Sequence, residues 1–184
     1  MRPAPPLEPS ATSHEPRVPA TRRRPPLYTP QQRERRDRTR WTLIQGVLAP
    51  VQFLVCLVSA ALVLRYLATG QGLWAASLSF IAKTALLYLI MVTGSIWEKV
   101  VFGRWLFAPA FFWEDVVSML VIALHTACLV GMLGGLMSAR TQMLLALAAY
   151  AAYVVNAAQF LLKLRAARLD EAHDRRNPFG AAPA

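Results

Sequence analysis

Charged side chains are scarce through most of this 184-residue sequence. Asp, Glu, Lys and Arg make up 16% of the residues and hydrophobic residues make up 55%, whereas a soluble globular domain has roughly 25% charged residues. The charges are also segregated, because residues 1–40 hold ten arginines and four acids while the apolar runs between positions 43 and 162 hold almost none. This composition disfavours a soluble domain and indicates a protein of the lipid bilayer.

Cysteines and common catalytic motifs are equally sparse. The two cysteines, Cys56 and Cys128, lie inside apolar runs. A disulfide framework or a metal site would need more ligands at closer spacing, so we predict that both are small core residues. The sequence contains no phosphate loop, nucleotide fingerprint or nucleophile elbow. Prolines and arginines interrupt each short apolar group in the first forty residues, so we expect the chain to enter the membrane through an uncleaved first helix rather than a signal peptide.

Long apolar runs are what the sequence has in abundance. Four of them, at about 43–64, 73–96, 116–136 and 143–162, each approach the roughly 20 residues that a helix needs to cross the hydrocarbon core. They are too long and too evenly apolar for the alternating strands of a barrel. The sequence therefore predicts an all-α polytopic membrane protein, a four-transmembrane-helix bundle within a domain of residues 27–169.

Two tails flank the predicted bundle. Residues 1–26 hold eight of the thirteen prolines and no apolar periodicity, so we expect a disordered extension rich in proline and arginine, and residues 170–184 form a C-terminal tail. Arginine and lysine gather before the first run and from position 163 onward, which predicts that both termini are cytoplasmic. The basic run 31–40 should contact anionic lipid headgroups rather than nucleic acid.

The stretch EKVVFGRWLFAPAFFWED, residues 98–115, connects the second and third runs on the same side as the termini. A glycine and a proline make it unsuited to a continuous span, and its six aromatic residues favour the headgroup level of the membrane. Three carboxyls, those of Glu98, Glu114 and Asp115, could converge at one rim beneath these rings. A carboxylic acid in such low-dielectric surroundings tends to keep its proton, which makes it a plausible proton donor.

The same acids have plainer explanations. Glu114 or Asp115 could cap the third helix, where a negative charge meets the positive end of the helix dipole. Glu98 could pair with Lys99 or Arg104. The sequence leaves these alternatives open.

Polar side chains inside the spans should face the bundle interior, because they are costly in hydrocarbon. Gln45, Gln52, Ser59 and Tyr66 recur at seven-residue intervals along one face of the first run, and we expect interhelical hydrogen bonds there, above all from Gln52 and Ser59 because Gln45 lies near the cytoplasmic end. We expect Lys83 to snorkel toward the membrane surface opposite the termini. His125 should lie near mid-membrane as a hydrogen-bonded core residue, although an intramembrane ionisable group is also a functional candidate. Three polar residues of the fourth run share one face that extends to its cytoplasmic end: Asn156, Gln159 and Lys163.

Four stretches of the sequence carry a family resemblance. They read LYTPQQRERRDRTRWTLIQGVLAPVQFLV, LVLRYLATGQG, KTALLYLIMVTGSIWEKVVFGRWLFAPAFFWEDVVSMLVIALHTA and MLLALAAYAAYVVNAAQFLLKLRAARL. Together they run from about residue 27 to residue 169, and they resemble the vinyl-bacteriochlorophyllide hydratase family of bacteriochlorophyll biosynthesis. The extension before residue 27 departs from the family pattern.

This resemblance implies a lyase that adds water to the ring-A 3-vinyl group of chlorophyllide a or 3-vinyl bacteriochlorophyllide. The product would carry a 3-(1-hydroxyethyl) group. It implies no cofactor, with magnesium present only as part of the chlorophyllide. It also implies the cytoplasmic or intracytoplasmic membrane of a photosynthetic bacterium, with membrane lipid, a magnesium chlorin and other enzymes of bacteriochlorophyll biosynthesis as partners.

A vinyl hydration needs a proton donor, a base for water and a flat apolar slot. Our hypothesis assigns the acid to Glu98 or Glu114, with Asp115 as its partner or as the base that orients water. His125 could ligate the magnesium of the pigment, though its depth favours a structural role. Lys99 or Arg104 could bind the substrate propionate. Five rings could stack on the macrocycle: Trp97, Phe107, Phe111, Phe112 and Trp113.

Two rival functions use the same features. A non-catalytic pigment-binding or assembly protein could carry chlorophyllide in the same pocket without reacting. A small transporter is a weaker alternative, because Lys83 and His125 are too few for a convincing ion path.

Overall fold

The computed structural model describes residues 26–176, apart from the side chains of 173–175, and contains five helices and no strand in that range. The helices are α1 (Pro30–Arg38), α2 (Arg40–Thr69), α3 (Leu73–Phe102), α4 (Phe112–Leu133) and α5 (Ala139–Arg176). Helices α2 to α5 are long and apolar enough to cross a membrane. The prediction of an all-α bundle with four spans is confirmed. The extension predicted over 1–26 lies, except for its last residue, outside the described residues.

The ends of the helices differ from the ends of the apolar runs, because local backbone signals set them. Helix α2 continues to Thr69 and stops at Gly70, whose φ of 72° lies in the left-handed region that glycine adopts without strain. Helix α3 stops in the same way at Gly103, with a φ of 80°. Helix α5 continues to Arg176, well past the last apolar run, because Arg, Ala, Leu and Glu are strong helix formers.

The apolar periodicity does not predict the short helix α1, but a capping motif in the sequence does. The hydroxyl oxygen of Thr29 accepts from the backbone N–H of Gln32 at 3.3 Å, and the Gln32 side chain accepts from the Thr29 N–H at 2.9 Å. This capping box, with Pro30 at the first helical position, is a helix start signal. The basic run 31–40 is therefore helical over most of its length.

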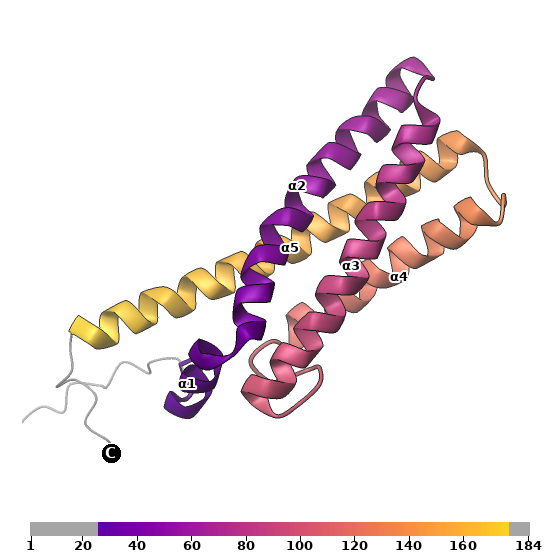
Figure 1. Cartoon of the computed structure of the whole chain (residues 1–184). Coiled ribbons are helices and arrows are strands. Elements are labelled where there is room, and N and C mark those ends of the chain that lie inside the picture. The colour runs from indigo at the N-terminus through magenta and orange to yellow at the C-terminus, as the bar shows by residue number, and fades with distance from the viewer. Residues whose placement is uncertain (1–25, 177–184) are drawn as a thin grey trace, which may run out of the picture.

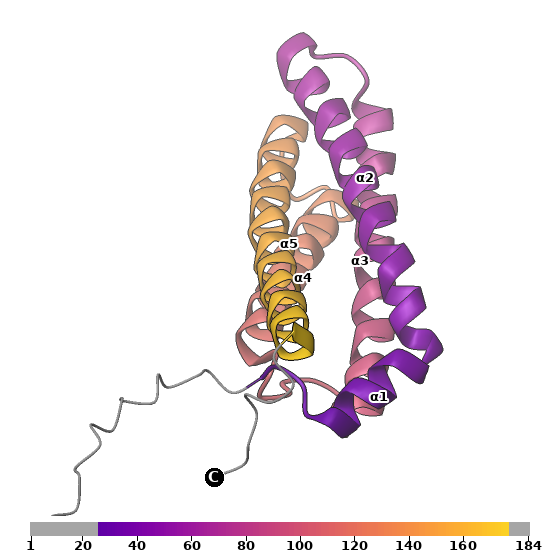
Figure 2. The same ribbon diagram turned by 90° about the vertical axis from the view of Figure 1, so that its left-hand side faces the viewer.

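The four long helices form two antiparallel pairs, α2 with α3 and α4 with α5 (Figure 1). Seen after a turn of 90°, the two pairs are neighbouring layers (Figure 2). The main hydrophobic core includes the buried side chains of Phe80, Leu87, Val121 and Tyr150. Helix α1 and the connection between α3 and α4 lie at the same end of the bundle (Figure 1), which we call the loop end.

Interhelical hydrogen bonds form along the predicted polar face of α2. Gln45 donates to the hydroxyl oxygen of Thr93 on α3 at 2.7 Å. The hydroxyl oxygen of Ser59 lies 2.7 Å from that of Ser79 and 2.5 Å from that of Tyr150 on α5. These contacts confirm that the polar residues of the first span join helices rather than face lipid.

The expected snorkelling of Lys83 is wrong. Its side chain is 0% exposed, and its Nζ lies 3.6 Å from the ring centroid of Tyr153. When the Gln52 amide is oriented so that its nitrogen donates to the Leu86 carbonyl oxygen at 2.9 Å, its oxygen accepts from Lys83 at 3.2 Å. An aromatic face and an amide oxygen thus stabilise the lysine inside the bundle.

Candidate active site

The connection between α3 and α4 interrupts the chain between two membrane helices, as the sequence predicts. Helix α3 ends at Phe102, the Gly103 N–H donates to the Lys99 carbonyl oxygen at 3.0 Å, and α4 begins at Phe112. Residues 103–111 form the loop between them. Glu98 therefore lies in the last turns of α3 and Asp115 in the first turns of α4, so the loop brings the two carboxyls to one place.

Glu98 and Asp115 form a buried acid pair. Glu98 is 5% exposed and Asp115 is 3% exposed, and the two carboxyls are close enough to repel each other when both are ionised. Two buried carboxyls side by side favour a state in which one of them keeps a proton, because that state avoids two like charges in low-dielectric surroundings. The arrangement thus holds a proton donor and a proton acceptor side by side.

Backbone amides of the loop fix the acid pair. The N–H of Ala108 donates to Glu98 Oε2 at 3.1 Å, and the N–H of Phe107 donates to Asp115 Oδ2 at 2.7 Å. Phe107 has a φ of 57°, a left-handed conformation that is uncommon for a bulky residue and that tends to occur at functional sites. The strained residue therefore contributes the amide that positions Asp115.

Glu114 has a different partner from the acid pair. It accepts from Lys163 of α5 at 2.5 Å, and the Lys163 Nζ lies 5.1 Å from the ring centroid of Phe111. Both Glu114 and Lys163 interact electrostatically with Asp115. The structure thus brings Glu98 and Asp115 together and holds Glu114 beside them on a lysine.

The plainer explanations of the acids hold only in part, because Glu114 and Asp115 do lie in the first turn of α4, where the helix dipole favours a negative charge. The residue at the N-cap of α4 is Phe111, with no side-chain hydrogen bond to the helix, so neither acid caps α4 through its side chain. Within residues 26–176, Glu98 has no ion pair with Lys99 or Arg104. The Lys99 ammonium instead donates to the Gly103 carbonyl oxygen at 3.1 Å.

The five rings predicted for the slot fall into two groups. Trp97 and Phe111 belong to a packed inner aromatic cluster, and Phe111 is only 1% exposed. In five pairs of rings within this cluster, the ring centroids are 5.7 to 5.8 Å apart. The cluster also contains three residues that sequence reasoning missed: Tyr28, Phe102 and Phe160. The other three rings, which we call the outer rings, are exposed and lie in the loop or in the first turn of α4: Phe107, Phe112 and Trp113.

The outer rings offer faces that a flat ligand could contact. The Phe107 and Phe112 ring centroids are 5.8 Å apart, those of Phe112 and Trp113 are 5.4 Å apart, and Trp113 is 70% exposed. Phe107 also supplies the amide that binds Asp115. Phe107 therefore belongs both to the exposed aromatic surface and to the backbone that holds Asp115.

Residues 28–36, which we call the strap, cover the inner aromatic cluster. The Tyr28 ring stacks on Phe102 with centroids 5.8 Å apart, and the Arg36 guanidinium lies 4.7 Å from the Tyr28 centroid and donates to Glu171 of α5 at 2.7 Å. Burial raises the pKa of Tyr28 to about 12, against the opposing effect of Arg36. Burial lowers the pKa of Arg36, but its hydrogen bonds to Glu171 and Asp37 outweigh that effect, so its pKa is raised. The strap thus ties α1 to α5.

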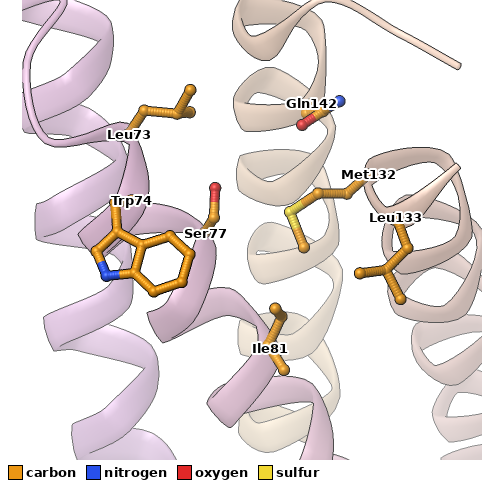
Figure 3. A pocket seen from close by; sticks show the side chains of 7 residues that line it. All are labelled: Leu73, Trp74, Ser77, Ile81, Met132, Leu133 and Gln142. Carbon is orange, nitrogen blue, oxygen red and sulfur yellow. The ribbon is translucent and has the colours of Figure 1, made fainter. Parts of the chain in front are cut away.

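Two pockets lie at opposite ends of the bundle. The loop-end pocket, of about 470 Å³, is lined by Pro26, Leu27, Gln32, Phe102, Pro109, Ala110 and Lys163. The other pocket, of about 390 Å³, lies between the start of α3, the end of α4 and the start of α5; its lining residues are Leu73, Trp74, Ser77, Ile81, Met132, Leu133 and Gln142 (Figure 3). This second lining has no ionisable group, so it cannot supply a proton donor.

His125 lies away from the acid pair. It is ten residues beyond Asp115 on α4, which is about 15 Å along the axis, and it is fully buried. Its Nδ1 lies 2.9 Å from the Val121 carbonyl oxygen, and its ring stacks on Phe80 with centroids 5.7 Å apart. The buried position and the Nδ1 hydrogen bond agree with the prediction of a core residue, whereas the buried Nε2 has no hydrogen-bond partner within residues 26–176. Cys56 and Cys128 are free and buried, which confirms their prediction as core residues.

Known proteins match nearly all of the folded chain. Residues 28–166 match the family described as 2-vinyl bacteriochlorophyllide hydratase. A relative of that name from Cereibacter sphaeroides is 67% identical over 144 residues, which cover 78% of this chain and 89% of the relative. Another of that name from Rhodobacter capsulatus is 59% identical over 159 residues, which cover 86% of this chain and 92% of the relative. No solved structure matches the chain.

Proposed function

The chain belongs to the 2-vinyl bacteriochlorophyllide hydratase family, and from that premise we propose that it adds water to the ring-A vinyl group of chlorophyllide a or a vinyl bacteriochlorophyllide. The product carries a 1-hydroxyethyl group, so the enzyme is a hydro-lyase of bacteriochlorophyll biosynthesis. The family supports the activity, and the buried pair of Glu98 and Asp115 supports the choice of residues. Adding water transfers no electrons to an acceptor, so the reaction needs no redox cofactor, and magnesium enters with the substrate.

Glu98 is the proton donor of the proposed mechanism. It lies in the last turns of α3, where the helix dipole opposes a negative charge, whereas Asp115 lies in the first turns of α4, where the dipole favours one. The proton of the pair therefore rests on Glu98. When it moves to the terminal vinyl carbon, the π electrons form the new C–H bond and the inner carbon becomes a cation that the conjugated macrocycle delocalises.

Asp115 is the base. Water attacks the inner carbon through its oxygen, which forms the C–O bond, and the proton that water loses passes to the Asp115 carboxylate. Asp115 then passes a proton to the neighbouring Glu98 carboxylate. One water is consumed in each cycle, and the pair ends in the state in which it began.

The substrate reaches the acid pair from the outer rings. The macrocycle lies against Phe107, Phe112 and Trp113 at the level of the lipid headgroups, and the exposed Lys99 or Arg104 binds its propionate. The backbone N–H of Phe107 is bound to Asp115, so Phe107 moves aside when the vinyl group approaches the carboxyls. We place the loop end on the cytoplasmic side of the bacterial inner membrane, since arginine and lysine gather there.

The activity itself can be tested with membranes from a host that expresses this chain and makes no pigment of its own. Vinyl chlorophyllide added to these membranes is expected to become a product one water heavier, as measured by mass spectrometry after extraction. Membranes that carry the Glu98→Gln, Asp115→Asn double variant are the control for uncatalysed hydration. Pigment that binds to wild-type membranes and stays unchanged would instead identify a pigment-binding or assembly protein.

The outer rings can be tested with two exposed tryptophans at opposite ends of the bundle. Trp113→Ala is expected to raise KM for vinyl chlorophyllide by about 5-fold or more, because a stacked aromatic contact contributes on the order of 1 kcal/mol beyond its buried area. Trp74→Ala is the matched control, since Trp74 is 79% exposed but lies in the pocket of Figure 3. Equal KM values for the two variants would contradict this placement of the macrocycle.

A further inference from the structure

Among the residues that the structure describes, the face of α5 that points toward α4 carries buried oxygen atoms without a hydrogen-bond partner. They are the side-chain carbonyl oxygens of Asn156 and Gln159, and Asn156 as a whole is 7% exposed. The two residues are three positions apart, and Lys163 follows four positions later, so all three lie on one face of the helix. Buried polar atoms normally have a partner, so this face is suited to a ligand that donates hydrogen bonds.

The hydrogen bonds around Asn156 fix the orientation of its amide. Ser118 of α4 donates to the Glu114 carbonyl oxygen at 2.8 Å, so its own oxygen is free to accept. The amide nitrogen of Asn156 donates to that oxygen at 2.9 Å. A reversed amide could accept from Ser118 only if this hydroxyl gave up its bond to the Glu114 carbonyl oxygen, so the orientation that keeps both hydrogen bonds leaves the Asn156 carbonyl oxygen without a partner among residues 26–176.

This acceptor site lies next to the acid pair. Ser118 is three residues after Asp115 on α4, which puts it on the same face of the helix about 4.5 Å farther from the loop. On the α5 side, Lys163 binds Glu114 and interacts electrostatically with Asp115. Lys163 therefore links the α5 face that carries the amide oxygens to the end of α4 that carries the acids.

We propose that Asn156 and Gln159 are positioning residues that hold the water consumed in the reaction. The inference rests on the proposed function. The two amide oxygens accept the hydrogens of one water, which aims a lone pair of its oxygen at the cationic inner carbon. As the C–O bond forms, one O–H bond breaks and that proton passes to Asp115, so the amides orient the nucleophile without themselves being protonated. A water bound by two to four polar partners is an ordinary buried site in proteins.

Substituting the amides with leucine tests the proposal. Asn156→Leu and Gln159→Leu should each lower kcat by about 10- to 100-fold, because a misplaced nucleophile loses that much rate, while KM for the pigment stays within about 2-fold. Gln45→Leu is the matched control, since it also removes an interhelical amide hydrogen bond but from α2, and it should leave kcat unchanged. Gln159→Leu carries the test if Asn156→Leu is not recovered from membranes in folded form.

A competing nucleophile gives a readout that a purely structural role would not change. In a mixture of water and methanol, addition of methanol yields a methyl ether and addition of water yields the alcohol. Loss of the water site should raise the ratio of ether to alcohol at least several-fold in the Asn156 and Gln159 variants and not in Gln45→Leu. An unchanged kcat or an unchanged ratio in both amide variants would overturn this inference alone, whereas wild-type membranes that form no alcohol would overturn the proposed function and the inference with it.

Discussion

In Glu98→Gln, the rate of hydration is expected to fall by about 10²- to 10⁴-fold, the range that a positioned general acid contributes. Glutamine has nearly the same shape as glutamate, and its side-chain oxygen can still accept from the Ala108 N–H that binds Glu98 at 3.1 Å. It has no acidic proton to give to the vinyl carbon. The variant therefore removes the chemistry of the residue and keeps the loop in place.

The rate is measured as alcohol formed per amount of protein extracted from the membrane, so that a loss of expression is not counted as a loss of catalysis. Glu114→Gln is the matched control, because Glu114 is also a nearly buried carboxyl at the loop end but is neutralised by Lys163 at 2.5 Å. Its rate should fall by less than about 10-fold. If Glu98→Gln keeps full activity and Glu114→Gln loses it, the proton donor is Glu114 and our assignment is wrong.

The sequence predicts much of the fold because the physical signals for it are local. Apolar runs of about 20 residues predict membrane helices without reference to the rest of the chain, and all four are present. Gly70 and Gly103 end their helices with left-handed φ values, and such glycines can be recognised from the sequence. The capping box of Thr29 and Gln32 is equally local. The prediction that Lys83 snorkels is wrong because the groups that stabilise it lie on other helices, among them Gln52 of α2.

The sequence predicts where the candidate site lies but not which of its carboxyls pair with each other. Glu98, Glu114 and Asp115 lie at the ends of adjacent spans, so their convergence follows from the topology. Which two carboxyls pair with each other depends on Lys163, which binds Glu114 and is 49 residues from it in the chain. It depends also on the conformation of Phe107, a φ of 57° that neither its residue type nor its neighbours indicate. Tertiary contacts and backbone strain thus decide what the sequence leaves open.

The aromatic residues show the same limit. Six of the eighteen residues from 98 to 115 are aromatic, and composition alone cannot separate rings that pack from rings that are available to a ligand. Phe111 is buried because Phe160 of α5 stacks on it with centroids 5.8 Å apart, whereas Trp113, two positions later, points away and stays exposed. Helical geometry places residues two apart on different faces, but it does not say which face meets α5.

Asp115→Asn should lower the hydration rate by an amount similar to that of Glu98→Gln, about 10²- to 10⁴-fold. The asparagine oxygen can still accept from the Phe107 N–H, which donates to Asp115 at 2.7 Å, and its amide can donate to Glu98. The geometry of the pair is kept, but no base remains for the proton of the attacking water. The loss should appear in kcat, because the outer rings and Lys99 or Arg104 bind the macrocycle in the proposed function, whereas the carboxyls transfer protons.

The double variant Glu98→Gln, Asp115→Asn separates a proton-sharing pair from two independent residues. If each carboxyl acted alone, the two losses would multiply, since the free energies of independent sites add. Residues that act as one unit are strongly non-additive, and Asp115 can return a proton only to an intact Glu98. We therefore expect the double variant to be within about 10-fold of the slower single variant, measured as alcohol formed per extracted protein. A loss equal to the product of the single losses would show that the two carboxyls do not pass a proton between them.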